Sequence, residues 1–251
     1  MVQAVNGPQA IAGRIPVSSK LSPGSNYWRA AYMGGRPNGV VVDDPQAFLL
    51  EMSPHQKLVP HFHTVDQFQI FVGGSGTIGR NKPQTLAHTM HYADHHTGYG
   101  PILASAQGFS YFTLRPQTDA GAVEIDKPGY REQLKPSRKR HFLCDLALST
   151  APVMQSRRES ALEPLIEGQS DYDDHLGAFL MRVGAGQQAI GPDPKGSGGQ
   201  YYLVLNGGLH YNGGDYPLWS LLFFAPDDPP CTFTAGAEGV ELFIGQYPRR
   251  D

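Results

Sequence analysis

Two histidines, His61 and His63, stand one residue apart within a β-type segment that runs from Pro60 to Gly74. Side chains alternate between the two faces of a strand, so both imidazoles are expected on one face, where they can reach a single metal ion. Gln67 keeps the same parity if the strand stays regular and adds a third polar group. The intervening positions, which are expected to pack on the opposite face, are Phe62, Phe68, Ile70 and Val72. The spacing predicts a metal-binding strand.

A second group of polar side chains follows about thirty residues later and comprises His91, His95, His96 and Tyr99. Histidines in a loop beside a cleft can complete a metal site, orient a substrate or transfer protons without a metal. In a strict strand His91 and His95 share a face, but a turn at His95 and His96 leaves their direction open. Residues of this group are therefore candidates both for metal ligands and for acid–base groups.

The composition favours short strands and many turns. Of 251 residues, 40% are hydrophobic and only 17% are charged, which is enough apolar material for a core and little charge for a helical protein. Glycine (30) and proline (21) are frequent but show no collagen-like period, as expected for strands bounded by turns. The length allows one large β domain or two of about half that size.

Charge and cysteine content exclude several classes of function. A net charge of −3 argues against a nucleic-acid surface, and the basic segment 138–141 is interpreted as a solvated turn. Two distant cysteines do not form a disulfide framework and fit a reducing compartment. Residues 1–17 lack the apolar core of a signal peptide, and no later stretch reaches membrane-spanning length. A cytoplasmic protein without a nucleic-acid or membrane partner is expected.

The chain contains an internal repeat. Four segments recur in the same order, at offsets of 131, 133, 132 and 131 residues. The matching pairs are 48–52 with 179–183, 66–74 with 199–207, 90–94 with 222–226, and 108–112 with 239–243. Such constant offsets predict two copies of one β module. Strand candidates in the first copy are 40–42, 48–52, 68–72, 90–93 and 109–114, and their spacing favours a sandwich or small barrel over βαβ units.

The two clearest helical patterns fall between the copies. Ser156 and Glu159 resemble a capping box ahead of an apolar run that ends near Gly168, although Pro164 would break it. A shorter helical segment is predicted over 130–134. Residues 141–148 are expected to form the opening strand of the second copy.

Together these residues resemble the cupin superfamily. Its first motif, His-x-His, three or four residues, Glu, about six residues and Gly, matches His61, His63, Gln67 and Gly74 with one substitution. Its second motif, Pro-x-Gly-x-x-His, falls on 94–99, where Tyr99 stands at the last position. In the second copy it falls on 226–231, which keeps only the proline.

The resemblance implies an all-β bicupin with two double-stranded β-helix (jelly-roll) barrels and a short helical linker. Residues 1–120 are assigned to the N-terminal barrel with the candidate metal site, 121–170 to the linker and the first strand of the second barrel, and 171–251 to a C-terminal barrel. Because the second copy lacks histidines at the motif positions, it is expected to be a structural or dimerising barrel. A homodimer is implied by the resemblance.

The resemblance also implies a divalent metal ion. His61 and His63 carry over as ligands, and Gln67 replaces the usual glutamate with a weaker neutral donor. His96 is slightly favoured over Tyr99 as the fourth ligand, with His91 and His95 as alternatives. The same pair, His96 and Tyr99, supplies the candidate catalytic proton donors. Imidazole ligands do not distinguish iron, zinc, nickel and manganese.

The functional hypothesis is a metal-dependent enzyme acting on a small organic acid or an enolisable carbonyl compound, of dioxygenase, lyase or isomerase type. Neutral ligands leave the full charge of the ion uncompensated, which favours an anionic substrate. The rim is expected to be aromatic, drawn from Phe62, Phe68, Tyr92, Tyr99 and Tyr111. The alternative is a small-molecule-binding or structural bicupin that has lost its metal site and performs no chemistry.

Overall fold

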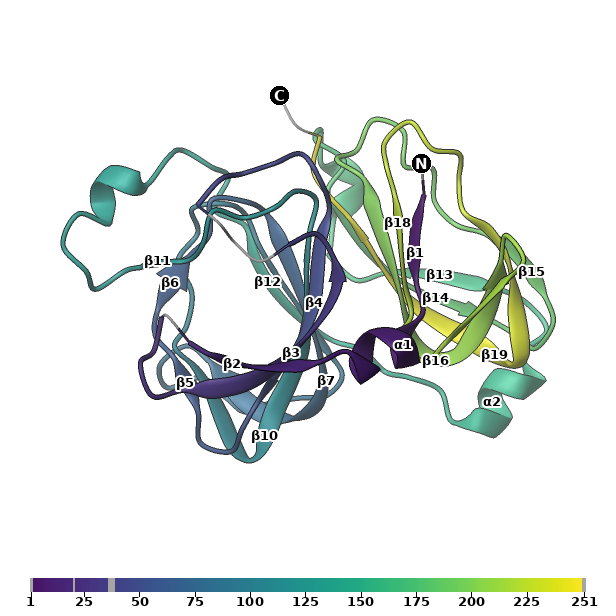
Figure 1. The fold of residues 1–251 in the computed structure, drawn as a ribbon. Coiled ribbons are helices and arrows are strands. Elements are labelled where there is room, and N and C mark those ends of the chain that lie inside the picture. The colour runs from purple at the N-terminus through teal and green to yellow at the C-terminus, as the bar shows by residue number, and fades with distance from the viewer. Residues whose placement is uncertain (1, 20, 36–38, 250–251) are drawn as a thin grey trace. The chain divides into compact units, whose positions relative to one another are not determined.

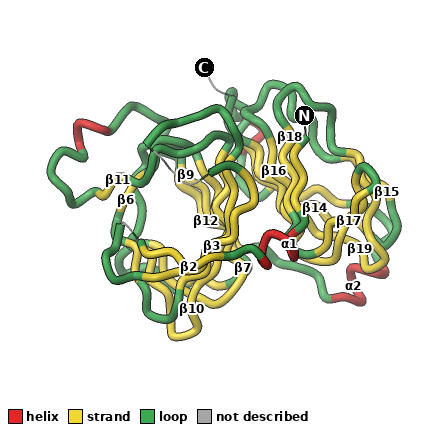
Figure 2. The backbone as a smooth tube through the Cα atoms, viewed as in Figure 1, coloured by secondary structure: helices red, strands yellow, loops and turns green. Residues whose placement is uncertain are grey.

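The computed structural model describes the chain apart from residues 1, 20, 36–38 and 250–251. The chain forms two compact units (Figure 1). Gly13–Asp145 is called the N-terminal barrel below, and the segments up to Ala12 and from Leu146 onward form the C-terminal barrel. Strands dominate each unit and the helices are short (Figure 2). The prediction of an all-β chain with two tandem barrels is confirmed. None of the described helices has the length and hydropathy needed to span a membrane.

The N-terminal barrel is built on one large antiparallel sheet with the strand order β12-β9-β7-β10-β4-β3-β2. Short strands β5 and β8 pair with β10 and β7, and a separate pair joins β11 to β6. The elements are β2 (Ile15–Ser18), β3 (Asn26–Met33), β4 (Gln46–Met52), β5 (Lys57–Leu58), β6 (His61–Phe62), β7 (Gln67–Ile78), β8 (Thr85–Leu86), β9 (Thr89–Ala93), β10 (Ile102–Arg115), β11 (Val123–Glu124), η1 (Arg131–Gln133) and β12 (His141–Asp145).

The C-terminal barrel has the strand order β1-β18-β16-β19-β14-β13, with β15 on β19 and β17 on β16. The N-terminal strand β1 therefore belongs to this unit. Its elements are β1 (Gln3–Val5), α1 (Gly7–Ala12), α2 (Ala151–Ser156), β13 (Ala161–Pro164), η2 (Gln169–Asp171), β14 (Gly177–Val183), β15 (Gln188–Ile190), β16 (Gln200–Tyr211), β17 (Gly214–Pro217), β18 (Leu221–Phe224) and β19 (Thr232–Gln246).

The internal repeat corresponds to the central strands of the two barrels. Strands β4, β7, β9 and β10 occur in the same order as β14, β16, β18 and β19, and the pairings within each set match. The correspondence reaches single residues at the strand ends. Arg115 at the end of β10 pairs with Gln46 at the start of β4, and Gln246 at the end of β19 pairs with Gly177 at the start of β14.

Glycines provide the same positive-φ backbone position in the long strand pair of both barrels. Gly74 has φ 67°, and a Cβ atom there would lie 2.2 Å from the carbonyl oxygen of Gly108. Gly207 also has φ 67°, and its Cβ would lie 2.1 Å from the carbonyl oxygen of Gly239. A side chain at either position would meet both the steric cost of a positive φ and a backbone clash. The final glycine of the first motif therefore shapes the long strand pair.

Strand β7 buries both of its faces, and the two faces differ in chemistry. Phe68, Ile70 and Val72 are buried on one face, as the period-two pattern predicts. On the other face Gln67 and Gln69 are buried beside Phe71. Buried amides need hydrogen-bond partners, and both glutamines find them in the site described below.

The helix predicted over 156–168 is wrong. Helix α2 ends at Ser156, and Ala161–Pro164 forms strand β13, which pairs with β14 at the edge of the sheet. Proline lacks the N–H that a helix interior requires but is tolerated on an edge strand. The short helical segment near 130–134 is present as the 3₁₀ turn η1.

The strand expected over 141–148 belongs to a different barrel from the one predicted. His141–Asp145 forms β12, which pairs with β9 of the N-terminal barrel. Phe142 stacks on Tyr92 with ring centroids 6.2 Å apart, and His141 contacts His91. These side chains give the strand its packing partners, which its position after the first repeat did not reveal.

Candidate functional site

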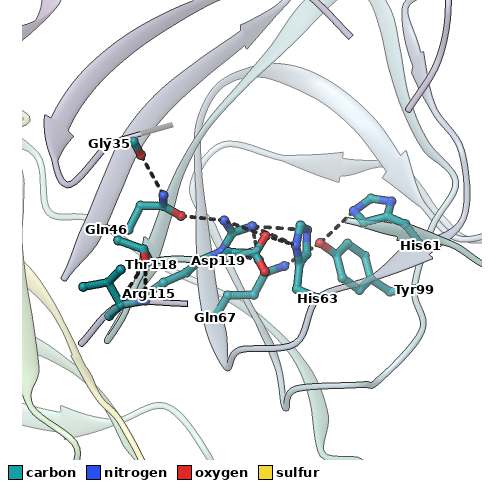
Figure 3. Close-up of polar contacts among 10 residues, drawn as sticks. Gly35, Gln46, His61, His63, Gln67, Tyr99, Arg115, Thr118 and Asp119 are labelled. Carbon is teal, nitrogen blue, oxygen red and sulfur yellow. Dashed lines mark hydrogen bonds and ion pairs between the residues drawn. The ribbon is translucent and has the colours of Figure 1, made fainter. Parts of the chain in front are cut away.

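The candidate site lies where several strand ends of the N-terminal barrel meet (Figure 3). His61 is in β6, His63 follows it directly, and Gln67 begins β7. Arg115 ends β10 and Asp119 lies four residues beyond it. Tyr99 is held next to His61 by an isolated antiparallel bridge with backbone N···O distances of 3.1 and 3.0 Å. Strand β11 pairs with β6 from the other side and fixes the His-x-His segment.

His61 is buried and presents an unprotonated Nε2 atom. Its Nδ1 lies 2.7 Å from the carbonyl oxygen of Val59, which can only accept a hydrogen bond, so Nδ1 carries the proton. Burial, together with the neighbouring His63, lowers the pKa of His61 to about 3, so the ring is neutral. Nε2 is then an acceptor and receives a hydrogen bond from the Tyr99 hydroxyl, whose oxygen lies 3.0 Å away.

His63 is held in the same tautomer by a carboxylate. Its Nδ1 donates to Asp119 Oδ2 over 2.6 Å. Burial and the Arg115 charge lower the pKa of His63, although Asp119 acts in the opposite direction. Burial would raise the pKa of Asp119, but Arg115 and His63 hold this pKa well below its usual range. Because burial and Arg115 prevail, His63 is neutral, and the ionised Asp119 fixes its single proton on Nδ1 and leaves Nε2 unprotonated.

Arg115 is the buried cation that ties these groups together. Nη1 lies 3.2 Å from Asp119 Oδ2 and donates to Gln46 Oε1 over 2.7 Å. Gln46 in turn donates to the backbone of Gly35 (Figure 3). Nη2 lies 3.2 Å from both ring nitrogens of His63, and this equal separation places it over the ring face. The guanidinium thus does not lie on the line of the Nε2 lone pair.

Gln67 bridges Arg115 and Tyr99. Its Oε1 accepts hydrogen bonds from Arg115 Nε and Nη2 at 3.2 and 3.0 Å, and its Nε2 donates to the Tyr99 hydroxyl. The amide oxygen, which is the only possible metal donor of this side chain, is therefore engaged by a cation. Burial raises the pKa of Tyr99, so the phenol stays protonated and donates a hydrogen bond to His61.

The structure brings Tyr99, and not His96, to the two histidines. The His96 ring packs on Phe62 with centroids 5.7 Å apart, and Phe62 points away from His61 and His63 along the strand. His96 has φ 57°, and this turn directs its ring to the opposite face. His95 is also elsewhere, with Nδ1 2.8 Å from Asp66. The preference for His96 as the fourth ligand does not match this geometry.

His91 lies behind the site. Its ring centroid is 5.0 Å from that of Tyr99, but its Nδ1 bonds to Gln69 and its Nε2 to His141, each over 2.7 Å. Burial and the neighbouring His141 lower the pKa of His91 well below its usual value, so it is neutral. His91 packs against the site without directing a lone pair into it.

A cavity of about 280 Å³ opens onto these groups. Of the aromatic residues expected at its rim, Tyr99 and Tyr111 line it, whereas Phe62, Phe68 and Tyr92 are buried elsewhere in the barrel. The polar lining residues include His61, His63, Gln69, Tyr99, Arg29, Arg115 and Asp119, and the apolar ones include Tyr27, Phe48, Leu50, Leu58 and Tyr111.

The donors present fit a divalent ion through three atoms. The Nε2 atoms of His61 and His63 are unprotonated, and each ring is fixed at Nδ1 by a carbonyl or carboxylate, as is usual for imidazole ligands. Tyr99 Oη lies beside His61 Nε2 and can act as an oxygen donor if it loses its proton. Among the described residues no cluster of three His, Cys, Asp or Glu side chains is placed to hold a metal. A third donor to an ion at the two imidazoles would therefore be of another type, and the Tyr99 hydroxyl is the oxygen beside His61.

Sequence reasoning missed Arg115 and Asp119. They lie more than fifty residues from His63, just beyond a strand whose apolar run had been recognised. The one available signal was an arginine directly after that buried run, followed four residues later by an aspartate. Nothing in the sequence indicated that both would be buried.

No protein-family model matches the chain, and no curated protein matches it. Solved structures are similar over nearly its whole length. A putative dioxygenase from Nostoc punctiforme is 12% identical with a TM-score of 0.57, covering 99% of this chain and 79% of that one. Salicylate 1,2-dioxygenase from Pseudoaminobacter salicylatoxidans, with gentisate adducts, is also 12% identical (TM-score 0.57; 98% and 81% covered).

The bacterial pirin YhhW from Escherichia coli, in a complex with nickel(II), is 12% identical with a TM-score of 0.56, and both chains are covered completely. At such identities the likeness establishes the fold alone. Together with the duplicated strand order, it shows that this chain has the bicupin fold.

Proposed function

We propose that the N-terminal barrel is the active site of a metal-dependent enzyme that acts on a small organic anion. The observation that carries this proposal is that two neutral imidazoles, His61 and His63, line one cavity with their Nδ1 protons fixed and their Nε2 atoms unprotonated. Tyr99 is the proposed third ligand. Gln67 supports the site by orienting Tyr99 and is not proposed as a ligand.

The charge of the cavity supports an anionic substrate. The formally charged residues among the described lining are Arg29, Arg115 and Asp119, two cations and one anion. Because the imidazoles are neutral, the lining carries an excess positive charge even without a metal ion. Charge of one sign in a cleft with low-dielectric walls attracts ligands of the opposite sign.

A divalent ion bound by these groups supplies Lewis acidity toward a carbonyl, carboxylate or enolate oxygen. The remaining chemistry comes from the side chains. Without an ion, the Tyr99 hydroxyl donates a hydrogen bond to His61 Nε2, and Gln67 Nε2 donates to the phenol oxygen. When the His61 lone pair is taken by the ion, Tyr99 loses this proton and its phenol oxygen is left as a ligand, still oriented by Gln67. Asp119 and Arg115 keep His63 in one tautomer and orientation.

The reaction type is proposed within the group of dioxygenases, lyases and isomerases. The dioxygenases among the structural neighbours support a reaction of this kind in this fold, and the nickel in the pirin structure supports a divalent ion. The C-terminal barrel is proposed to be structural.

Metal analysis tests the proposal. The chain is purified without added metal, reconstituted separately with iron, zinc, nickel and manganese, and assayed for bound metal by elemental analysis. We expect one ion per chain in the wild type and none in His61→Ala or His63→Ala. His55→Ala, at an exposed position outside the cavity, is the matched control and keeps the metal.

The opposite result would favour the alternative function. A wild-type chain that binds no stoichiometric metal under any of these conditions contradicts the metal-dependent enzyme. The same cavity would then serve as a binding pocket without metal chemistry. Retention of the metal in both histidine variants would contradict the assignment of the site.

A further inference from the structure

Gln69 lines the cavity one layer of side chains away from Arg115. In the register of β7 and β10, Gln69 is paired with Thr113. Gln67 and Arg115 lie two residues further along these strands, at the candidate site. Thr113 is paired in turn with Phe48 of β4, and both line the cavity. Because two residues of a strand span about 7 Å, the cavity reaches over roughly that distance from Arg115 to a second polar layer, formed by Gln69 and Thr113.

The direction of the Gln69 amide follows from a chain of hydrogen bonds behind the cavity. His91 Nδ1 lies 2.7 Å from Gln69 Oε1, which can only accept a hydrogen bond, so Nδ1 carries the proton. Burial and the neighbouring His141 lower the pKa of His91 well below its usual value, so the ring is neutral and its Nε2 is unprotonated. His141 Nε2, 2.7 Å away, therefore donates to His91 Nε2. The hydrogen bonds are donated in one direction, from His141 through His91 to Gln69.

This chain turns the amino group of Gln69 away from His91. Because Oε1 accepts from His91, the group that Gln69 offers to the cavity is Nε2 with its N–H donors. When a substrate displaces water from the cavity, this donor keeps a partner only if the substrate supplies an acceptor. A site built to hydrogen-bond a group of its substrate rejects the analogue that lacks this group, because the donor is then left unpaired.

We propose that Gln69 determines substrate specificity by donating a hydrogen bond to a neutral oxygen of the substrate, with His141 and His91 as the positioning residues of its amide. This inference rests on the proposed function and extends its substrate class. With the anionic end of the substrate beside Arg115, the accepting oxygen lies about 7 Å away. A cavity of about 150 Å³ is known to hold benzene. The volume of about 280 Å³ therefore suits one ring that carries both groups.

Calorimetric titration of the EDTA-treated full chain tests the specificity. The probes are 4-acetylbenzoate and 4-isopropenylbenzoate, which share their charge and nearly their shape but differ in the carbonyl oxygen, which a methylene group replaces. We expect the wild type to bind the acetyl compound about tenfold more tightly, as one hydrogen bond provides. Gln69→Met keeps the length of the side chain and removes the donor, so this variant should bind the two probes equally.

Variants of His141 test the positioning, and long-range ¹H–¹⁵N NMR spectra show which ring nitrogen of His91 carries the proton. We expect the proton on Nδ1 in the wild type and in His141→Lys, whose ammonium group offers donors alone. His141→Phe removes the donor, so His91 should lose the pure Nδ1 form and the preference for the acetyl compound should fall to about half or less. His210→Phe is the matched control, because His210 is an exposed strand histidine of the C-terminal barrel. It should leave the preference unchanged.

Several results would contradict the role of Gln69. Equal binding of the two probes by the wild type, binding of neither, or a preference that survives Gln69→Met would each overturn it. A His91 proton on Nε2 would overturn it as well, and the wild-type spectra show this even if Gln69→Met does not fold. An unchanged preference and tautomer in His141→Phe would contradict the positioning role of His141.

The metal content of the same proteins before EDTA treatment separates this inference from the proposed function. If the wild type binds no metal but the preference depends on Gln69, the enzyme proposal fails and the specificity of the cavity stands. If the metal is present but the wild type binds the two probes equally, only the role of Gln69 fails.

Discussion

At the scale of single residues, local periodicity predicted the two candidate metal-binding histidines but not the side chains that contact them. His61 and His63 share a face because strand side chains alternate, and this rule needs no knowledge of the rest of the chain. Asp119 and Arg115 reach them only after the sheet has formed. Tyr99 could be named as one alternative by motif position, but the choice between Tyr99 and His96 depended on a turn with positive φ at His96.

Asp119→Asn tests whether Asp119, one of the two residues that sequence reasoning missed, holds His63 in the tautomer that can bind a metal. An asparagine can offer its amide N–H to His63 Nδ1, which would move the ring proton to Nε2 and remove the lone pair needed by a metal. We expect metal affinity to fall by about ten- to hundredfold, as is typical when such an outer partner is lost. Competition with a chromogenic chelator measures the affinity.

Asp66→Asn is the control for this substitution, because Asp66 bonds to His95 in the same way but away from the cavity. It should leave the metal affinity unchanged. Circular dichroism shows whether each variant is folded. Normal metal affinity in a folded Asp119→Asn chain would contradict the positioning role of Asp119.

At the scale of elements, the repeat and the strands were predictable, whereas the linker was not. Long strands flanked by glycine carry a strong period-two signal, and two copies reinforce it. Between the copies, Ala161–Pro164 is short and mostly exposed, and its pairing with β14 makes it a strand. Strand β12 likewise depends on β9, a partner from the preceding repeat.

Gly74→Ala tests the element that both barrels share. The new Cβ would meet the Gly108 carbonyl at 2.2 Å in a backbone with φ 67°. We expect a loss of about 3 kcal/mol in unfolding free energy, measured by urea denaturation. Gly207→Ala should cost a similar amount in the C-terminal barrel.

Gly35→Ala is the comparison, because nothing lies within 4 Å of its Cβ position. It should change the unfolding free energy by less than about 0.5 kcal/mol. A Gly74→Ala chain as stable as Gly35→Ala would show that the strand pair tolerates a side chain there.

At the scale of the whole molecule, one framework carries two different interiors. Gln200 and Gln246 begin β16 and end β19 and bond to each other over 2.6 Å. The corresponding residues of the N-terminal barrel are Gln67 and Arg115. The duplicated strands therefore keep their order and pairing, whereas Arg115 gives only the N-terminal barrel a cation at this strand end, beside His61 and His63. This difference supports assigning chemistry to one barrel.

The buried imidazoles of the N-terminal barrel also make the stability of the chain depend on pH. Burial lowers the pKa of His61 and of His91 in the folded state, so below about pH 6.5 the unfolded chain binds more protons than the folded one. The unfolding free energy should therefore fall as the pH is lowered from about 7 toward 4. Each such histidine contributes at most about 1.4 kcal/mol per pH unit.

Two substitutions distinguish the contribution of the buried histidines from a general sensitivity to acid. The unfolding free energy of each variant is measured by urea denaturation of EDTA-treated protein between pH 7.5 and 4.5. His91→Gln should make the unfolding free energy depend less steeply on pH, by an amount that corresponds to at most one bound proton. His95→Gln should make it steeper, because the hydrogen bond to Asp66 raises the pKa of His95, so protonation of His95 stabilises the fold at low pH. If both variants change the slope in the same direction, the buried neutral state of His91 is not what makes the fold sensitive to acid.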